Sequence, residues 1–341
     1  MKKAIFEKKN ILIAGGAGFV GSHLCDELVK ESKVICIDNF STGEERNIDH
    51  LLANPNFEFV RHDINEPIDL ENLPELQKFK IQFQGIQEIY NLACPNSPIR
   101  FEDNVINTLL ANSQAVKNLL EMAKKFESKI LHFSSSVVYG PRNEDIRRIE
   151  ESNPGIVDPL SKRSSYDEGK RFAETMVVNY RDFYNIDAKI IRLFRTYGPR
   201  MKLDDGNMIP DFIRDALDNK DLEVPGDENF FSSFCYVTDV VDAAVKMMDS
   251  NSKGPINIGS DVDINVFTVA KKIVQAIGSE SKVKEADKHY FITPQAIPDI
   301  TKSRTELGWL PIQTLDKGLE LTIQDLRANK GIKSVKDTLD N

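Results

Sequence analysis

The sequence has few cysteines and no long hydrophobic run. Its four cysteines, Cys25, Cys36, Cys94 and Cys235, are scattered over 341 residues without C-x-x-C spacing. This distribution does not indicate a disulfide framework or a metal site. It is typical of a reducing compartment, so we expect a cytoplasmic protein. No stretch approaches the roughly 20 apolar residues of a membrane-spanning helix, so we expect no membrane partner.

Basic residues are fewer than acidic residues. The chain has 44 lysines and arginines against 53 aspartates and glutamates, a formal net charge of −9. No basic segment is long enough to offset this acidity, which argues against a nucleic-acid partner. Residues 1–10 are basic and residues 11–20 apolar, as in a short signal peptide. Three glycines interrupt the apolar run and no A-x-A-like cleavage site follows, so we expect no export.

What is present is an alternation of β-rich and helical segments. Hydrophobic residues make up 40% of the chain and charged residues 28%, which is typical of one large globular domain or two joined ones. We expect strands at 11–14, 33–38, 57–60, 86–93, 129–134 and 188–194, and helices at 22–31, 103–125 and 165–184. This alternation predicts an α/β fold with a doubly wound, parallel Rossmann sheet covered on both faces.

The pattern becomes irregular after residue 195. We expect helices at 208–217, 238–249 and 266–277 and a strand at 255–258. In the tail, 301–326, a Gly-Trp-Leu-Pro break is followed by one amphipathic helix. These helices and this strand predict a second, smaller C-terminal α/β lobe.

A glycine-rich segment follows the first strand. Gly15, Gly18 and Gly21 have G-x-x-G-x-x-G spacing, which allows a tight turn and lets the backbone approach a pyrophosphate at a helix N-terminus. Alone, such a turn could be purely structural. Asp38 ends the next strand, about 20 residues on, where a carboxylate accepts both ribose hydroxyls and repels a 2′-phosphate. We therefore predict a dinucleotide site that prefers NAD to NADP, although Asp38 could also be only a turn residue.

Two further strand ends point to the same cofactor cleft. Asp63 and Ile64 follow the third strand and are expected beside the adenine, and Leu92 and Ala93 follow the fourth and are expected to line the cleft. Ordinary packing at strand ends is an alternative for both pairs.

Tyr166 and Lys170 have the i, i+4 spacing of neighbours on one helix face. A nearby ammonium favours the phenolate form of tyrosine and brings its pKa toward the working range of a base. Ser134, Ser135 and Ser136 lie at the end of the preceding core strand, where a hydroxyl can hold a substrate oxygen. A chance Y-x-x-x-K sequence with a solvated lysine is the alternative, and the order of glycine loop, aspartate, serine and tyrosine–lysine pair argues against it.

These segments resemble the extended short-chain dehydrogenase/reductases that act on nucleotide sugars. The resemblance rests on GGAGFVGSHL (15–24), DNFSTG (38–43), HDI (62–64), NLACPNSP (91–98), SSSVVYG (134–140), YDEGKRFAETM (166–176), YGPRM (197–201), YVTDVV (236–241), PDI (298–300) and LGW (307–309). It spans nearly the whole chain and is strongest to the UDP-glucuronate decarboxylase-like group, beside epimerases and 4,6-dehydratases.

The resemblance implies a division of the chain and a set of site residues. Residues 1–194 with about 232–260 would form the NAD-binding domain, and about 195–231 with 261–341 the nucleotide-sugar lobe. The implied catalytic residues are Ser135, Tyr166 and Lys170. Those implied to bind NAD are Gly15, Gly18, Phe19, Val20, Gly21, Asp38, Asn39, Ser41, Thr42, Gly43, Asp63, Ile64, Leu92, Ala93, Tyr166 and Lys170. Those expected to bind substrate are Ser135, Ser136, Arg195, Arg200 and Asn207.

The departures from the family pattern concern the chemistry beyond oxidation. Val137 stands where decarboxylases and dehydratases usually carry a Glu, and Ser232 where decarboxylases carry an Arg. Valine cannot act as an acid or base, and without the arginine a sugar carboxylate loses a bidentate partner. Further departures are Arg195 for Asn, Asn207 for Arg, Ala296 for Arg, and Pro225 for an aromatic residue.

We therefore expect an NAD-dependent enzyme limited to redox chemistry at C4 of a nucleotide-diphosphate sugar, a 4-dehydrogenase or a 4-epimerase. A UDP-glucuronate decarboxylase with replacement residues and a non-enzymatic NAD-binding protein are the alternatives. Arg195 and Arg200 could take over pyrophosphate recognition or could form surface ion pairs. Family resemblance further implies a homodimer or homotetramer assembled through the helices at 103–125 and 165–184, although their apolar residues could equally be internal core.

Overall fold

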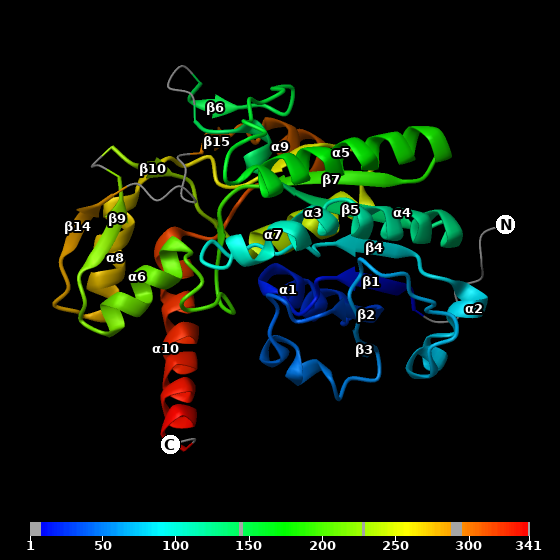
Figure 1. Ribbon diagram of the computed structural model, residues 1–341, viewed down its shortest axis with the longest axis horizontal. Helices are drawn as coiled ribbons and strands as arrows, with labels where there is room; N and C mark the ends of the chain where they lie inside the picture. The colour runs from blue at the N-terminus through cyan, green and yellow to red at the C-terminus, as the bar shows by residue number, and fades with distance from the viewer. Residues whose placement is uncertain (1–7, 143–145, 227–228, 288–294, 340–341) are drawn as a thin grey trace.

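A seven-stranded parallel sheet forms the centre of the computed structural model (Figure 1), which describes residues 8–142, 146–226, 229–287 and 295–339. Its strands are β1 (Asn10–Ala14), β2 (Lys33–Asp38), β3 (Phe57–Arg61), β4 (Glu88–Asn91), β5 (Lys129–Ser135), β7 (Ala188–Leu193) and β12 (Ile256–Ile258). Their order is β12-β7-β5-β4-β1-β2-β3, and all neighbours are parallel. The strand order reverses direction at β1, so the predicted doubly wound Rossmann sheet is confirmed.

The central strands β1 and β2 form where four apolar residues follow one another without alternation. Every residue of β1 and β4 is buried, because helices cover both faces of the sheet. Ile11 pairs with Val34 on one side and Glu88 on the other, which fixes the register of the three central strands. Each strand expected before residue 195 is present and ends within two residues of its expected bounds.

Helices cover the two faces of the sheet and bury separate apolar clusters. One face packs against α1 (Phe19–Leu28), α7 (Val237–Asp249) and the segment at α9 (Thr301–Leu307), through residues such as Leu24, Val240 and Trp309. The other packs against α4 (Gln114–Phe126) and α5 (Ser164–Tyr184), with α3 (Val105–Ala111) beside α5. Short helices lie in the connections: η1 (Glu45–Asn47), η2 (Asp49–Leu51), η3 (Pro74–Phe79), α2 (Ile81–Gln84), η4 (Glu102–Asn104) and η5 (Ser136–Tyr139).

The single helix expected over 103–125 is wrong. The structure breaks it between α3 and α4 at Asn112 and Ser113. The Ser113 hydroxyl donates to the Leu109 carbonyl at 2.7 Å, while its backbone N–H turns to Leu110. A short polar side chain thus satisfies the carbonyl that a continuous helix would bond through its backbone.

The C-terminal part of the chain builds a separate apolar cluster beside the sheet (Figure 1). It contains α6 (Met208–Leu217), α8 (Val266–Ile277), α10 (Leu315–Leu339), β9 (Leu222–Pro225) and β14 (Val283–Ala286). Two-stranded pairs complete it and its junction with the sheet: β6 (Arg148–Ile149) with β15 (Ile297–Pro298), β8 (Thr196–Tyr197) with β11 (Cys235–Tyr236), and β10 (Phe231–Ser232) with β13 (Ile264–Asn265). β12 returns from this part of the chain to the sheet, but the exact domain bounds stay a prediction.

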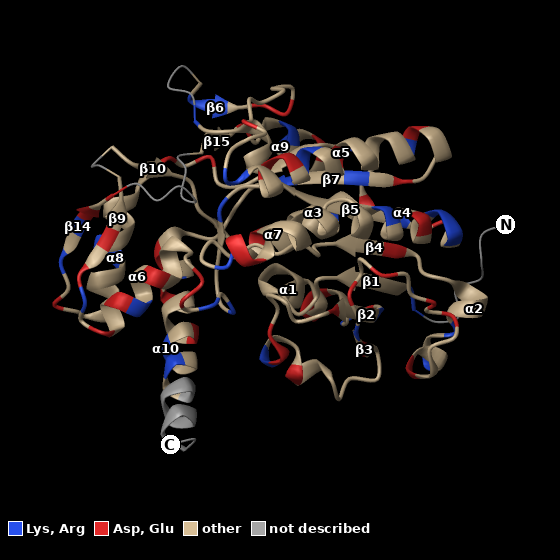
Figure 2. Ribbon diagram, in the orientation of Figure 1, with Lys and Arg blue, Asp and Glu red and all other residues tan. Residues whose placement is uncertain are grey.

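The surface carries charges of both signs. In the view of Figure 2, basic and acidic residues are interspersed along the helices. Across the described residues, no helix combines the length and the hydropathy needed to span a membrane.

Candidate active site

The glycine-rich turn joins β1 to α1 with no room for side chains. Gly15 has a φ of +80°, and a Cβ built on it would lie 2.9 Å from the Ala93 nitrogen. A Cβ on Gly21 would collide with the Gly15 carbonyl oxygen, so α1 passes directly over the turn. Gly18 is the N-cap of α1. The bare backbone and the helix N-terminus form a cradle that fits a dinucleotide pyrophosphate.

Asp38 lies at the end of β2, on the wall of the same cavity. Its carboxylate accepts hydrogen bonds from the backbone N–H groups of Ala17 at 3.0 Å and Phe40 at 2.8 Å. Burial raises the pKa of Asp38, and these N–H groups partly offset the effect by stabilising the charged form. The carboxylate is therefore fixed in orientation and keeps lone pairs for two ribose hydroxyls.

A cavity of about 400 Å³ opens along the carboxyl ends of the sheet strands. It brings together all the predicted site residues except Gly43, from Gly15, Gly18, Phe19, Val20 and Gly21 through Asp38, Asn39, Ser41, Thr42, Asp63, Ile64, Leu92 and Ala93 to Ser135, Ser136, Tyr166, Lys170, Arg195, Arg200 and Asn207. Gly43 instead packs against Asp38, so closely that a Cβ added to Gly43 would lie 3.0 Å from both carboxylate oxygens.

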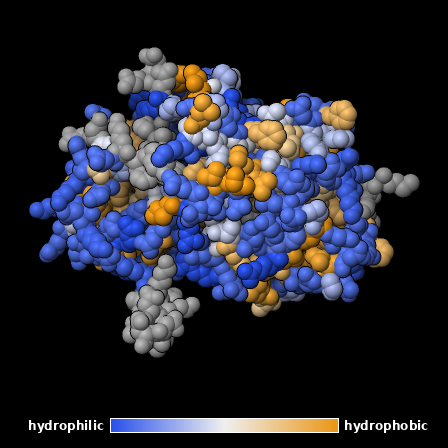
Figure 3. All heavy atoms as spheres, in the orientation of Figure 1, coloured by the Kyte–Doolittle hydropathy of each residue, from blue (hydrophilic) through white to orange (hydrophobic). Residues whose placement is uncertain are grey.

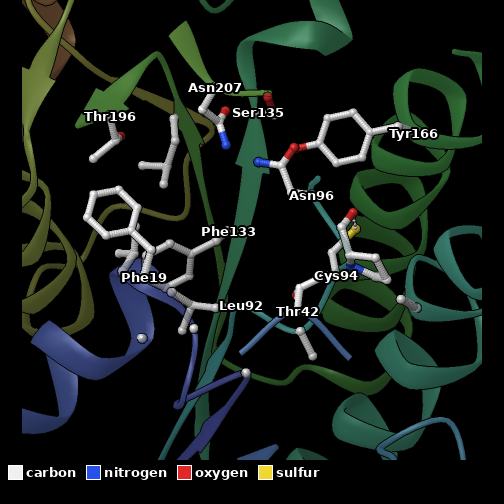
Figure 4. A pocket seen from close by; sticks show the side chains of 18 of the residues that line it. Phe19, Thr42, Leu92, Cys94, Asn96, Phe133, Ser135, Tyr166, Thr196 and Asn207 are labelled. Carbon is white, nitrogen blue, oxygen red and sulfur yellow. Dashed lines mark hydrogen bonds between the residues drawn. The ribbon is translucent and has the colours of Figure 1, made fainter. Parts of the chain in front are cut away.

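Tyr166 and Lys170 face this cavity from the first turns of α5. The Lys170 ammonium is buried, donates to the Phe133 carbonyl at 2.9 Å, and lies 5.9 Å from the centre of the Tyr166 ring. Ser135 ends β5 and lies on the side of Tyr166 that carries the phenol oxygen (Figure 4). Burial raises the pKa of Tyr166 above its ordinary value, an increase that Cys94 reinforces and the Ser135 hydroxyl reduces. Burial therefore outweighs the groups that lower this pKa, which are Ser135 and Arg163, and the lowering expected from Lys170 does not set the pKa in this state.

The two predicted substrate arginines differ in their surroundings. Arg200 forms an ion pair with Asp26 of α1 at 2.6 Å, so the carboxylate partly neutralises its charge. Arg195 lies over the Phe230 ring, with 6.0 Å between its Cζ atom and the ring centre. Burial and the charge of Arg163 lower the pKa of Arg195 to about 10. Arg195 is thus a cation in an electropositive part of the cavity.

The two departures from the family pattern are also buried. Val137 lines the cavity beside Ser136, and Ser232 lies in β10. Neither side chain supplies an acid, a base or a positive charge. The Ser136 hydroxyl donates to the Gln295 amide oxygen at 3.0 Å, which brings the segment before β15 to the cavity.

Sequence reasoning missed several residues that line the cavity. Cys94 and Asn96 lie just beyond β4, and Figure 4 draws Asn96 in the part of the cavity toward which the Tyr166 oxygen points. Their position after a strand at the switch in strand order was a usable signal. Arg163 precedes Tyr166 by three residues, the spacing of neighbours on one helix face.

A largely buried ion pair connects the helix that carries Tyr166 to the sheet. Glu174 of α5 accepts two hydrogen bonds from Arg192 of β7, at 2.7 and 2.9 Å, and both side chains are 12% exposed. Ser134, next to Ser135, also donates to Glu174 at 2.6 Å. This network holds the end of β5 and α5 in one arrangement.

Replacing Glu174 with glutamine should lower the free energy of unfolding by about 3 kcal/mol, because it leaves a buried guanidinium without its counter-charge. Urea denaturation measures the change. Glu168→Gln is the matched control, since Glu168 lies on the same helix and pairs with Arg171 at the surface. We expect it to change stability by less than about 0.5 kcal/mol. Equal effects of the two substitutions would contradict the role of the buried pair.

Comparison with known proteins places this site in a family. The sequence model of the NAD-dependent epimerase/dehydratase family matches residues 11–259. The chain belongs to this family. This epimerase/dehydratase is 39% identical over 324 residues to UDP-glucuronic acid decarboxylase 5 of Arabidopsis thaliana, with 94% of this chain and 90% of the plant protein covered. It is 37% identical over 322 residues to UDP-glucuronic acid decarboxylase 1 of Xenopus tropicalis, with 94% and 73% covered.

A solved structure supports the same assignment. The UDP-glucuronic acid 4-epimerase of Bacillus cereus, in complex with UDP-glucuronic acid and NAD, superimposes with a TM-score of 0.80 and 28% identity. The superposition covers 94% of this chain and 99% of that one.

The comparisons make this epimerase/dehydratase an NAD-dependent enzyme of the nucleotide-sugar-modifying short-chain dehydrogenase/reductases. They confirm the predicted cofactor and argue against the non-enzymatic alternative. The names of the curated relatives favour the decarboxylase alternative over the 4-dehydrogenase or 4-epimerase that the sequence analysis preferred.

Proposed function

We propose that this enzyme oxidises the C4 hydroxyl of a nucleotide-diphosphate sugar. The observation that supports this best is the convergence of Tyr166, Lys170 and Ser135 on the wall of the cavity that the glycine-rich turn and Asp38 also line. Oxidation of an alcohol needs a base for the hydroxyl proton and an acceptor for the hydride. NAD, when bound, supplies the hydride acceptor.

Each of the three side chains has a role in this proposal. The Tyr166 phenolate removes the proton from the C4 hydroxyl, and the Ser135 hydroxyl holds the same oxygen in place. The Lys170 ammonium, fixed by the Phe133 carbonyl, favours the charged phenolate.

We further propose that the substrate is a nucleotide hexuronate and that oxidation is followed by loss of its carboxylate as CO₂. A C4 ketone makes the sugar a β-keto acid. The electron pair of the breaking bond between C5 and the carboxylate carbon can then flow into the ketone without a base at C5. C5 afterwards takes up a proton, and the C4 ketone is reduced by the hydride that the first step removed, so the product is a nucleotide pentose. Val137 is therefore compatible with decarboxylation, whereas 4,6-dehydration requires removal of the C5 proton and loses its catalyst. The identity to named decarboxylases over nine-tenths of the chain supports this outcome.

A 4-epimerase acting on the same substrate class is the second candidate. Two observations favour it: Val137 and Ser232 both replace residues usual in decarboxylases, and the Bacillus cereus structure is a UDP-glucuronic acid 4-epimerase. In this outcome the ketone turns over within the site and is reduced from its other face.

Incubation with UDP-glucuronate and NAD separates the outcomes. We expect release of CO₂, measured by trapping ¹⁴CO₂ from carboxyl-labelled substrate. We also expect formation of a UDP-pentose, identified by NMR of the products. Formation of UDP-galacturonate without CO₂ would assign the epimerase. Stoichiometric accumulation of NADH at 340 nm with a 4-keto hexuronate would assign a 4-dehydrogenase. If no accepted nucleotide sugar gave either a product or NADH, the oxidation proposal would be wrong.

We also propose that the chain forms a homo-oligomer through α3 and α5. Large apolar side chains that are 41–66% exposed lie on these two helices: Ile106, Leu109, Leu110 and Phe172. Figure 3 shows hydrophobic residues gathered over this part of the surface. We expect light scattering after size-exclusion chromatography to give at least twice the monomer mass, and Leu109→Asp to reduce it. A wild-type monomer at micromolar concentration would contradict the proposal.

A further inference from the structure

Two cysteines meet beneath the glycine-rich turn. Cys25 of α1 and Cys36 of β2 are free thiols, and both residues are fully buried. A Cβ built on Gly16 would lie 2.5 Å from the Cys36 sulfur and 3.2 Å from the Cys25 sulfur, so both sulfur atoms border the same point of the turn. The absence of a side chain at Gly16 leaves this point to the two thiols.

The thiols interact with each other and with the turn. The Cys25 thiol donates to the Gly16 carbonyl oxygen at 3.7 Å. A hydrogen bond with Cys25, together with burial, raises the pKa of the Cys36 thiol well above its ordinary value. Cys36 therefore stays protonated in this state, and the protonated form of a cysteine is the unreactive one.

The thiol pair lies between the two parts of the cofactor site. The backbone N–H of Gly15 donates to the Ile37 carbonyl oxygen at 2.8 Å, and Ile37 follows Cys36 in β2. Asp38 comes two residues after Cys36, so the two side chains leave the strand on the same face. A movement of Cys36 would therefore displace both the turn that fits a pyrophosphate and the carboxylate that fits a ribose.

We propose that Cys25 and Cys36 are a redox-modification site, and that the reversible disulfide between them weakens the binding of NAD. The oxidant is a low-molecular-weight disulfide, such as oxidised glutathione. Because both thiols are buried, the oxidant reaches them only when α1 and the turn open locally, and NAD bound on the turn opposes this opening. The proposal concerns the cofactor alone and does not depend on the reaction at C4.

The oxidation proceeds by two thiol–disulfide exchanges. One protein thiolate attacks a sulfur atom of oxidised glutathione, forms a mixed disulfide and releases one glutathione thiolate. The second protein thiolate attacks the protein sulfur of the mixed disulfide, forms the bond between Cys25 and Cys36, and releases the second glutathione thiolate. Two electrons and two protons pass from the protein to the oxidant, which leaves as two molecules of reduced glutathione.

The disulfide changes the turn in two ways. Oxidation removes the Cys25 S–H group, so the Gly16 carbonyl oxygen loses its donor. It also replaces a hydrogen-bond contact between the sulfur atoms by a covalent bond, which draws α1 toward β2. A Cβ on Gly21 would already collide with the Gly15 carbonyl oxygen, so α1 cannot approach β2 without moving the turn. The turn then departs from the shape that fits NAD.

Redox titration of the full chain tests the first part of the proposal. The protein is equilibrated in mixtures of reduced and oxidised glutathione, from both the reduced and the oxidised side, and circular dichroism confirms that it stays folded. Mass spectrometry after trypsin digestion should then find peptides 10–30 and 34–46 joined by one disulfide. Cys235, which is only 1% exposed, is the internal control and should remain a thiol.

The affinity for NAD tests the second part. Titration calorimetry should show that the oxidised protein binds NAD at least about tenfold more weakly than the reduced protein. Because the coupling is reciprocal, saturating NAD should lower the equilibrium constant for disulfide formation by the same factor, within about twofold. These two measurements are independent and must agree.

Cys25→Ser is the matched variant. Serine keeps a hydroxyl that can donate to the Gly16 carbonyl oxygen, but it cannot form the disulfide. The affinity of Cys25→Ser for NAD should therefore be the same in reduced and in oxidised glutathione. If this variant does not fold by circular dichroism, Cys36→Ala gives the same test from β2.

Three results would overturn the proposal. The first is a folded protein that forms no bond between Cys25 and Cys36 at equilibrium with oxidised glutathione. The second is a disulfide form that binds NAD as tightly as the dithiol form. The third is a loss of NAD affinity in oxidised Cys25→Ser, which would assign the effect to another thiol, such as Cys94 on the cavity wall. None of these measurements requires turnover, so failure here is distinguishable from failure of the proposed function.

Discussion

Replacing Tyr166 with phenylalanine should lower kcat by about 1,000-fold while leaving the affinities for NAD and the nucleotide sugar within about threefold. The substitution removes the phenol oxygen and keeps the ring. In our proposal this oxygen takes the C4 proton, and such proton transfer contributes about 10²–10⁴ in rate. Single-turnover formation of NADH, followed at 340 nm with the accepted sugar nucleotide, measures the effect on oxidation directly.

Tyr184→Phe is the matched control, since Tyr184 ends the same helix and is exposed at the surface. Its turnover should equal that of the wild type. The pH dependence gives a second readout. Because burial raises the pKa of Tyr166, the phenolate fraction and the rate should rise about tenfold per pH unit through neutral pH. Ser135→Ala should move this rise to higher pH, because Ser135 lowers the pKa. Unchanged turnover in Tyr166→Phe would remove tyrosine from the mechanism.

Substitution of Gly15 by alanine should weaken NAD binding at least about 100-fold. The φ of +80° strains any side chain there, and the new Cβ would lie 2.9 Å from the Ala93 backbone nitrogen. Because backbone cannot yield as a flexible side chain does, the turn must move away from the place that the pyrophosphate occupies. Such a loss corresponds to about 2.7 kcal/mol of binding free energy. Calorimetric titration of the cofactor-free protein with NAD measures it.

Gly278→Ala separates crowding from backbone strain. Gly278 follows the last residue of α8 with a φ of +75°, and a Cβ added to it would meet no other part of the described chain within 4 Å. The substitution therefore introduces a similar strain without a collision, and it should leave NAD binding unchanged. A similar loss of affinity in both variants would mean that general destabilisation, and not the shape of the turn, weakens the cofactor.

The sheet could be predicted from sequence because its strands are continuous apolar runs. Segments such as 11–14 and 34–37 are apolar throughout, so burial on both faces follows directly from composition. The glycine-rich turn could also be predicted, since the spacing of its glycines indicates a backbone conformation that is unfavourable for other residues. Local patterns of this kind need no knowledge of distant contacts.

Features that depend on distant contacts could not be predicted. The ion pair between Arg200 and Asp26 joins residues 174 positions apart, and nothing near Arg200 in the sequence indicates it. The approach of the Arg195 guanidinium to the Phe230 ring likewise follows from the pairing of β8 with β11. The break at Ser113 had a local cause, but a serine within a helical pattern is compatible with both a continuous and a broken helix.

β12 leaves the ribosome well after β7, the strand with which it pairs. β7 ends at Leu193, and its outer partner begins at Ile256, roughly 60 residues later. At about 5–20 residues per second, this edge of the nascent sheet waits on the order of 3–12 s for its neighbour. β7 carries Lys189 and Arg192, and charged side chains on an open edge discourage pairing with other nascent chains. The same arginine that later anchors α5 can thus protect the unfinished protein from aggregation.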